Sequence, residues 1–170
     1  APLPQAVGFG LNEAQAVMTI TRATPQEAAE ILELQRLCYR REAELYEDYS
    51  IAPMTQTVEA MRGDIAGQVV LVAREDGRIV GSVRGRLDAG TCHVGRLIVH
   101  PACERRGIGS QLMAALEAAV PEATRFELFT GHRSEGNLRL YARLGYREFR
   151  RQPVNGRLTL VYMEKPRAAG

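Results

Sequence analysis

The stretch from Leu97 to Ser110 constrains this chain most. Apolar residues typical of a strand, Leu97 to Val99, break at Pro101, and Arg105-Arg106-Gly107-Ile108-Gly109-Ser110 then opens an amphipathic helical pattern. Glycines let the backbone approach a ligand without a Cβ in the way, and the first amides of a helix have no intrahelical partner. The helix dipole and the two arginines add positive potential. Such a loop is typical of a site for a phosphate-bearing ligand.

Two familiar phosphate loops do not match this stretch. The dinucleotide fingerprint requires a third glycine three residues after Gly109, where Leu112 stands. The nucleotide-triphosphate loop requires Gly-Lys-Ser or Gly-Lys-Thr, and the only lysine of the chain is Lys165. A glycine pair before a helix is also common in plain turns, so the remainder of the chain must decide between a turn and a ligand site.

Composition limits the class of protein and its partners. The chain has 170 residues, of which 45% are hydrophobic and 25% charged, as is ordinary for one globular domain. A net charge of +2 with dispersed arginines does not favour a nucleic-acid partner. No apolar run approaches the roughly 20 residues of a membrane span, so we expect no membrane partner.

The cysteines and histidines do not indicate a metal site. Cys38, Cys92 and Cys103 are odd in number and lack zinc-type spacing, which favours a reducing, cytoplasmic location. Cys92 and His93 share a predicted strand with His100, and ligands spread along one strand cannot converge on an ion. We therefore expect no metal.

The pattern predicts a single domain of 18–165. Residues 1–17 are interpreted as a flexible N-terminal extension, because they are small and apolar without the basic start and apolar core of a signal peptide. Residues 166–170 are interpreted as a C-terminal tail. No repeat and no interdomain linker divides the domain.

Hydrophobic periodicity and turn residues predict an alternating order of elements. The capping box of Thr24 to Glu27 starts a helix that continues to Tyr46. The other predicted elements are strands at 18–22, 69–74, 79–87, 91–100, 125–129, 146–150 and 158–164, and helices at about 55–65, 108–120 and 134–144. A meander followed by strand-helix-strand crossover implies an α/β fold with a mixed sheet and helices on both faces.

Two runs resemble the signatures of a known superfamily. The residues from Arg96 through Met113, R-L-I-V-H-P-A-C-E-R-R-G-I-G-S-Q-L-M, resemble the acetyl-coenzyme A loop of the GNAT N-acetyltransferases. The run from Thr130 to Tyr141, ending in Leu144-Gly145-Tyr146, resembles their second signature. The resemblance covers about Met18 to Glu164. It implies the acyl-CoA N-acyltransferase fold, a central, mostly antiparallel twisted sheet that splays open at the cofactor site.

The resemblance also implies roles for individual residues, with acetyl-CoA as the acetyl donor. The backbone of Leu97, Ile98 and Val99 would pair with the pantetheine amides. Asn137 would bond the pantetheine or line the acetyl site, and Tyr141, one helical turn later, would protonate the departing thiolate. The backbone amides that would bind the pyrophosphate are those of Arg105, Arg106, Gly107, Ile108, Gly109 and Ser110. Glu104 stands where the family usually has Gln or Arg, which bears on cofactor affinity.

The proton acceptor is less constrained. Only a free amine attacks a thioester, so a base must take a proton directly or through water. His93, four residues before Leu97, matches a position at which some relatives place a histidine or carboxylate, although a purely structural histidine fits the pattern equally. His132, Glu127 and Glu44 are alternatives.

The predicted function is therefore acetyl transfer from acetyl-CoA to a primary amine by direct attack in a ternary complex. The alternative is a non-catalytic coenzyme A binding or sensing module. The acceptor would contact the region from Arg36 to Met61, which carries tyrosines and acids, and we expect a small-molecule amine rather than a protein. The resemblance is also compatible with a homodimer.

Overall fold

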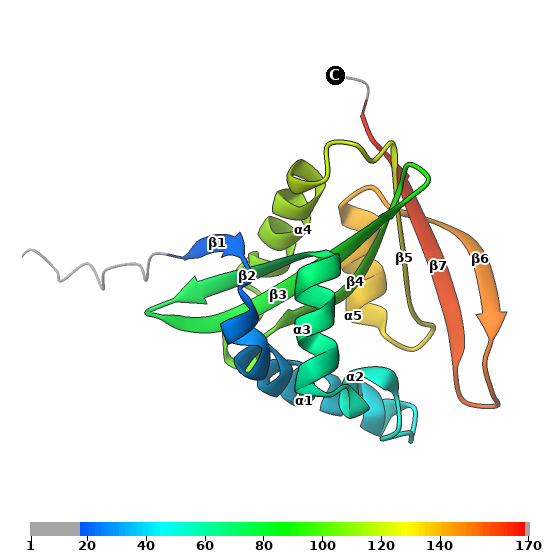
Figure 1. The fold of residues 1–170 in the computed structure, drawn as a ribbon. Helices are drawn as coiled ribbons and strands as arrows, with labels where there is room; N and C mark the ends of the chain where they lie inside the picture. Colours follow the sequence, from blue (N-terminus) through cyan, green and yellow to red (C-terminus); the bar gives the residue numbers. More distant parts are fainter. Residues whose placement is uncertain (1–17, 169–170) are drawn as a thin grey trace, which may run out of the picture.

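The computed structural model describes residues 18–168; the predicted extension 1–17 lies outside the described residues. These residues form one seven-stranded sheet in the order β1-β2-β3-β4-β5-β7-β6 (Figure 1). The strands are β1 (Thr19–Arg22), β2 (Val69–Glu75), β3 (Arg78–Asp88), β4 (Thr91–Val99), β5 (Arg125–Gly131), β6 (Arg147–Pro153) and β7 (Thr159–Pro166). The helices are α1 (Ala28–Leu45), α2 (Ala52–Thr55), α3 (Val58–Gly67), α4 (Ile108–Ala119) and α5 (Glu135–Arg143). The predicted mixed sheet with helices is confirmed.

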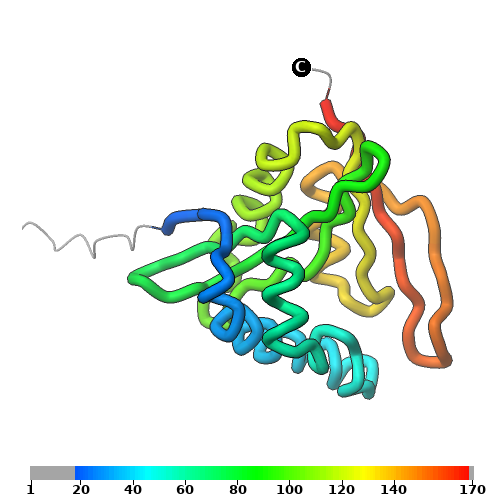
Figure 2. Tube along the Cα trace, in the orientation of Figure 1, coloured from blue at the N-terminus to red at the C-terminus, as the bar shows by residue number. Residues whose placement is uncertain are grey.

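The sheet opens between β4 and β5. All other neighbouring strands are antiparallel, whereas these two are parallel and pair only over residues 91–93 of β4 and 125–127 of β5. Beyond these residues the two strands diverge, as the tube in Figure 2 shows. The second half of β4 therefore has one unpaired edge.

The helices cover the two faces of the sheet. On one face, α4 and α5 enclose a core that includes Leu112, Leu116, Phe126 and Tyr141. On the other face, α1 and α3 pack over β2, β3 and the end of β4, with Ile31, Leu32 and Met61 fully buried (Figure 1). Every residue of β6 is exposed. The second face is thus covered only at one end of the sheet.

The helix predicted at about 55–65 is α3, which begins at Val58, and the short helix α2 precedes it where no helix was predicted. Pro53 lies in the first turn of the short helix α2, where a missing amide hydrogen is tolerated. The hydroxyl of Thr57 then accepts a hydrogen bond from the Ala60 amide at 3.1 Å and caps the N-terminus of α3. Because Gln56 and Thr57 both have extended ψ angles, the chain turns between the two helices and the side chain of Gln56 is available for other contacts.

Two residues of the predicted C-terminal tail take part in the fold. Strand β7 continues through Pro166. The guanidinium of Arg167 donates to the carbonyls of Glu117, Val120 and Ala123 and so covers the C-terminal end of α4. No helix within residues 18–168 is both long enough and apolar enough to cross a membrane.

Candidate active site

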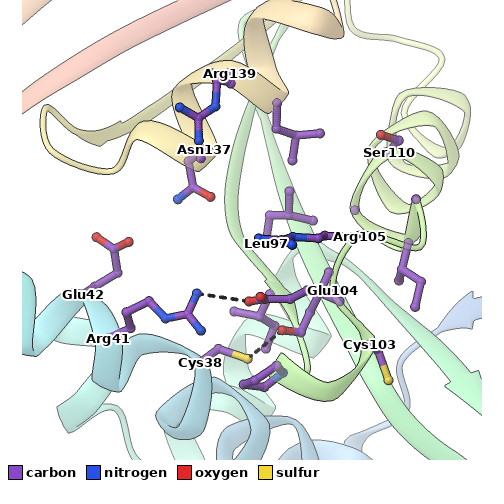
Figure 3. A pocket seen from close by; sticks show the side chains of 18 of the residues that line it. Cys38, Arg41, Glu42, Leu97, Cys103, Glu104, Arg105, Ser110, Asn137 and Arg139 are labelled. Carbon is purple, nitrogen blue, oxygen red and sulfur yellow. Dashed lines mark hydrogen bonds and ion pairs between the residues drawn. The ribbon is translucent and has the colours of Figure 1, made fainter.

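A cleft of about 550 Å³ lies where β4 and β5 separate. Helix α1 forms one wall and α5 the opposite wall, and the loop before α4 closes one end (Figure 3). Of the predicted cofactor-binding residues, all except Arg106 line this cleft: Leu97, Ile98, Val99, Arg105, Gly107, Ile108, Gly109, Ser110 and Asn137. The structure therefore brings the two sequence signatures together around one cavity.

The unpaired edge of β4 faces this gap. Ile98 pairs with Ser82 of β3, and the amide of His100 donates to the Val80 carbonyl at 2.7 Å. Since the hydrogen-bonded residues of an antiparallel ladder alternate, Leu97 and Val99 direct their backbone groups to the other side. Of the three predicted strand residues, Leu97 and Val99 thus direct main-chain groups into the gap, where the Val99 carbonyl accepts from the Cys38 thiol, whereas those of Ile98 are used within the sheet.

A β-bulge lies at the same point. The pairing of β3 with β4 shifts register after Ser82, so that Arg96 and Leu97 together lie opposite a single residue of β3. Arg96 has a φ of +51°, a left-handed conformation that is uncommon for a residue with a side chain. The bulge places the Leu97 amide at the opening between the strands.

The loop before α4 leaves helix amides without side-chain partners. Arg105 (φ +63°) and Gly107 (φ +78°) both have left-handed backbone conformations. Gly107 is the N-cap of α4, and among the described side chains none caps this helix and no acidic residue lies in its first turn. By contrast, Thr57 caps α3 with its own hydroxyl. The N-terminus of α4 is therefore suited to an external anion.

The charged side chains that line the cleft have a net positive charge. It includes the four arginines Arg41, Arg105, Arg139 and Arg143 and the two glutamates Glu42 and Glu104. Arg41 of α1 forms an ion pair with Glu104 at 3.2 Å, which joins the wall to the loop (Figure 3). The charge of Glu104, which stands where the family usually has Gln or Arg, is thus neutralised by an arginine from α1.

Arg106 departs from the prediction. Its guanidinium forms an ion pair with Glu75 at the end of β2, and this contact holds the pKa of Glu75 below its ordinary value. Its side chain therefore adds less potential to the cleft than the sequence suggested, because an adjacent carboxylate offsets the charge. The role predicted for its backbone amide stays a prediction.

Tyr141 and Asn137 lie on the same side of α5, but only Asn137 lines the cleft. The Asn137 amide is 3.4 Å from the Thr130 hydroxyl of β5. Tyr141 is 7% exposed, and burial, with the nearby Tyr39 and Glu42, raises the pKa of its phenol above the ordinary value. The hydroxyl is therefore protonated at neutral pH, as a proton donor requires.

His93 lies outside the cleft wall. Its Nδ1 is 3.4 Å from Oε2 of Glu127, which occupies the paired position on β5. Arg125 donates to both Glu127 and Glu164 at 2.7 Å and stabilises these carboxylates. The structure thus brings together two of the predicted candidates for the base, at the point where β4 and β5 begin to diverge.

Helix α1 contributes cleft residues from the region 36–61, which the sequence analysis assigned to acceptor contact. Cys38, Tyr39 and Glu42 line the cleft, and the Cys38 thiol donates to the Val99 carbonyl at 3.3 Å. Leu34, Cys38 and Glu42 follow one another at four-residue spacing, which indicates that they lie on one face of the helix.

Cys38 and Cys92 carry no reactive thiolate. Burial raises the pKa of Cys38 to about 12 and that of Cys92 to about 11, so both are neutral thiols at pH 7. Within the part of the chain that the structure describes, no three His, Cys, Asp or Glu side chains gather in a group that could hold a metal ion.

Comparison with known proteins assigns the family. The family model described as Acetyltransferase (GNAT) family matches residues 28–146, a range that contains both signatures and most of the cleft. The chain belongs to the GNAT acetyltransferase family. A mycothiol acetyltransferase of Actinosynnema mirum is 34% identical over 130 residues, which are 74% of this chain and 41% of that protein. The chain thus spans about two fifths of the length of this GNAT relative.

Solved structures have the same fold. The PaiA N-acetyltransferase of Thermoplasma acidophilum, in complex with coenzyme A, superposes with a TM-score of 0.74 at 16% identity, over 88% of this chain and 99% of that one. The structure of yncA from Salmonella typhimurium with acetyl-CoA has a TM-score of 0.72 at 20% identity, over 91% and 96%. The predicted acyltransferase fold of this GNAT chain is confirmed.

Proposed function

We propose that this GNAT domain is an acetyl-CoA-dependent N-acetyltransferase that transfers an acetyl group to a primary amine. One observation carries the proposal: the unpaired edge of β4 leads through a loop of left-handed residues to a helix N-terminus that no described side chain caps. An extended chain of amides that ends in a diphosphate matches this order of free backbone groups.

The residues present fit coenzyme A. Leu97 and Val99 would hold the pantetheine amides, and the amides at the start of α4 would hold the diphosphate. Arg139 and Arg143 of α5 and Arg105 of the loop lie where they would add charge-assisted contacts to phosphate oxygens. The PaiA and yncA structures, which share the fold, contain coenzyme A and acetyl-CoA.

The same residues would support direct attack by the amine. Bound acetyl-CoA supplies the acetyl group as an activated thioester. The Leu97 amide at the bulge would donate to a carbonyl oxygen in the gap, where a fixed donor stabilises developing negative charge. Tyr141, protonated and buried beside Glu42, is the proposed proton donor to the leaving sulfur. The neutral thiols of Cys38 and Cys92 support transfer without a covalent intermediate.

We assign the removal of the amine proton to His93 with Glu127. The two side chains lie 3.4 Å apart at the divergence of β4 and β5. Since the histidine lies outside the cleft wall, the proton would pass through water. Holding amine and thioester in line would supply most of the rate effect.

A second candidate function is a module that binds coenzyme A without transferring acetyl groups. It is favoured by one observation, that neither Tyr141 nor His93 lies on the cleft wall. In both cases we propose a cytoplasmic protein, consistent with the three free cysteines Cys38, Cys92 and Cys103. A homodimer remains compatible with either function.

Release of free thiol from acetyl-CoA tests the two candidates. A panel of small primary amines is mixed with the protein and acetyl-CoA, and the thiol is measured with a chromogenic disulfide, while coenzyme A binding is followed by the shift in thermal unfolding. We expect both binding and amine-dependent thiol release. Binding without thiol release for every amine would favour the binding module, and stabilisation by ATP but not by coenzyme A would contradict both.

A further inference from the structure

A polar network joins the sheet to the helices beside the cleft. The guanidinium of Arg84 on β3 forms an ion pair with Asp64 of α3. The amide of Gln56, between α2 and α3, donates to the same carboxylate, and its oxygen accepts from Arg96 of β4 at 3.1 Å. Arg84 and Asp64 are only 14% and 23% exposed. Two guanidinium groups and one carboxylate therefore share a partly buried space.

Arg96 is the charged group in this network that has no ion-pair partner. Among residues 18–168 no carboxylate lies within ion-pair distance of it, and Gln56 is a neutral partner. Burial and the nearby Arg84 lower the pKa of Arg96 below its ordinary value, while Tyr39 and Asp64 act in the opposite direction. A desolvated cation beside another cation is unfavourable unless an anion joins them. The network therefore has room for one negative charge.

The backbone of Arg96 lies directly before a residue that lines the cleft. Its φ of +51° in the bulge is a strained conformation that is maintained by the surrounding structure. The next residue, Leu97, faces the gap between β4 and β5 and lines the cleft. The bulge thus places the unpaired cation one residue from the proposed acetyl position.

Tyr39 connects this network with the cleft. It lines the cleft, and its pKa is raised to about 12 by burial, while Arg96 and Arg84 act to lower it and Glu42 to raise it. Glu42 lines the same cleft, so a molecule beside Tyr39 would meet an anionic group.

We propose that Arg96, supported by Arg84, binds the carboxylate of the acceptor, and that the acceptor is a small amino acid rather than a protein terminus. This inference rests on the proposed acetyl transfer. Two arginines and one aspartate leave a single positive charge, which matches a monoanionic carboxylate. Glu42 lines the cleft, where its carboxylate would attract the ammonium group before it loses its proton. A protein N-terminus has no carboxylate next to its amine, because that group is consumed in the peptide bond.

Pairs of amines that differ only in the carboxylate test the inference. Each pair consists of a free amino acid and its primary amide, assayed for thiol release from acetyl-CoA. We expect kcat/KM to be about 10- to 100-fold higher for the acid, as for a charge-assisted hydrogen bond. Arg96→Gln should abolish this preference by lowering the value for the acid and not for the amide, with the KM for acetyl-CoA unchanged.

Two variants separate carboxylate binding from a structural role. Arg62→Gln removes an exposed arginine of α3 that pairs with Glu59 and should keep the full preference. Arg96→Lys keeps the charge without the planar fork and should retain part of it. As a readout other than activity, free amino acid should raise the thermal unfolding temperature of wild type with coenzyme A bound, and not that of Arg96→Gln.

The possible failures are distinguishable. Acetylation of acids and amides at equal rates by wild type would overturn the carboxylate site and leave the acetyltransferase function intact. An equal loss for acid and amide in Arg96→Gln would assign Arg96 a structural role and also overturn it. Absence of thiol release with every amine, acids and amides included, would contradict the proposed function and with it this inference.

Discussion

The two ends of the cleft are built in different ways. The end assigned to the cofactor comes from one continuous segment and uses mainly backbone: the edge of β4, the loop at 104–107 and the start of α4. The end assigned to the acceptor uses side chains from α1, β3, β4 and the α2–α3 region. Backbone geometry can be predicted from a local motif, whereas contacts between side chains of different elements depend on the whole fold.

The largest effect is expected where α1 is docked on β5. A Cβ at Gly131 would lie 2.0 Å from the Tyr46 hydroxyl, which is hydrogen-bonded to the Ser134 hydroxyl and the Arg133 amide at 2.9 Å. Gly131→Ala should therefore displace the end of α1 and destabilise the protein by about 3 kcal/mol, the upper range for overpacking. Urea unfolding measures this loss.

Gly136→Ala is the matched control for this change. Gly136 lies in α5, and no atom of the described residues would lie within 4 Å of its Cβ. Alanine there should be neutral or stabilise the helix by about 0.5 to 1 kcal/mol. Equal urea midpoints for the two variants would show that the contact between α1 and β5 does not hold the acceptor end in place.

Substitution of Tyr141 tests whether the two ends cooperate in catalysis. Tyr141→Phe should lower turnover by about 100-fold and leave coenzyme A binding nearly unchanged. Since the pKa of Tyr141 is raised above its ordinary value, the phenol is protonated from pH ~6 to ~9 and the loss should be constant over this range. Turnover against pH, measured beside Tyr49→Phe at a 58% exposed position, checks this. Unchanged turnover would exclude Tyr141 as the proton donor.

A smaller effect is expected at the cofactor end. Gly107 (φ +78°) and Gly77 (φ +75°) have the same left-handed conformation, and a Cβ at either would meet no described atom within 4 Å. Alanine at each should destabilise the fold by about 1 to 2 kcal/mol. Only Gly107→Ala should also weaken coenzyme A binding, by about 10-fold, because its Cβ lies where the diphosphate would approach. Calorimetric titration of both variants distinguishes them, and equal affinities would remove Gly107 from the proposed site.

The order of elements could be predicted from the sequence because its signals are local. Alternation and turn residues such as Asp76-Gly77 determine the strands, and the capping contact of Glu27 with the Thr24 amide at 2.8 Å starts the first helix. The short helix α2 was missed, and the start of α3 was predicted three residues too early. This start depends on the Thr57 cap and on side-chain contacts with distant residues, which periodicity does not report.

The site could be predicted mainly in its backbone part. The sequence predicted Gly107 beside a diphosphate and Leu97 beside the pantetheine, and both residues line the cleft, as does the predicted Asn137. It did not reveal that Arg106 would pair with Glu75, nor that Arg96 would lie beside Gln56, a residue 40 positions away in the chain. These contacts arise from the pairing of β3 with β4 and the packing of α3 on the sheet. No motif encodes them.

A crystal structure of the protein with coenzyme A tests the central claim most directly. We expect the diphosphate at the amides that start α4 and the pantetheine along Leu97 and Val99, with its sulfur toward Arg96 and Tyr39. Coenzyme A bound elsewhere, or a gap between β4 and β5 filled by the protein's own side chains at saturating ligand, would contradict it.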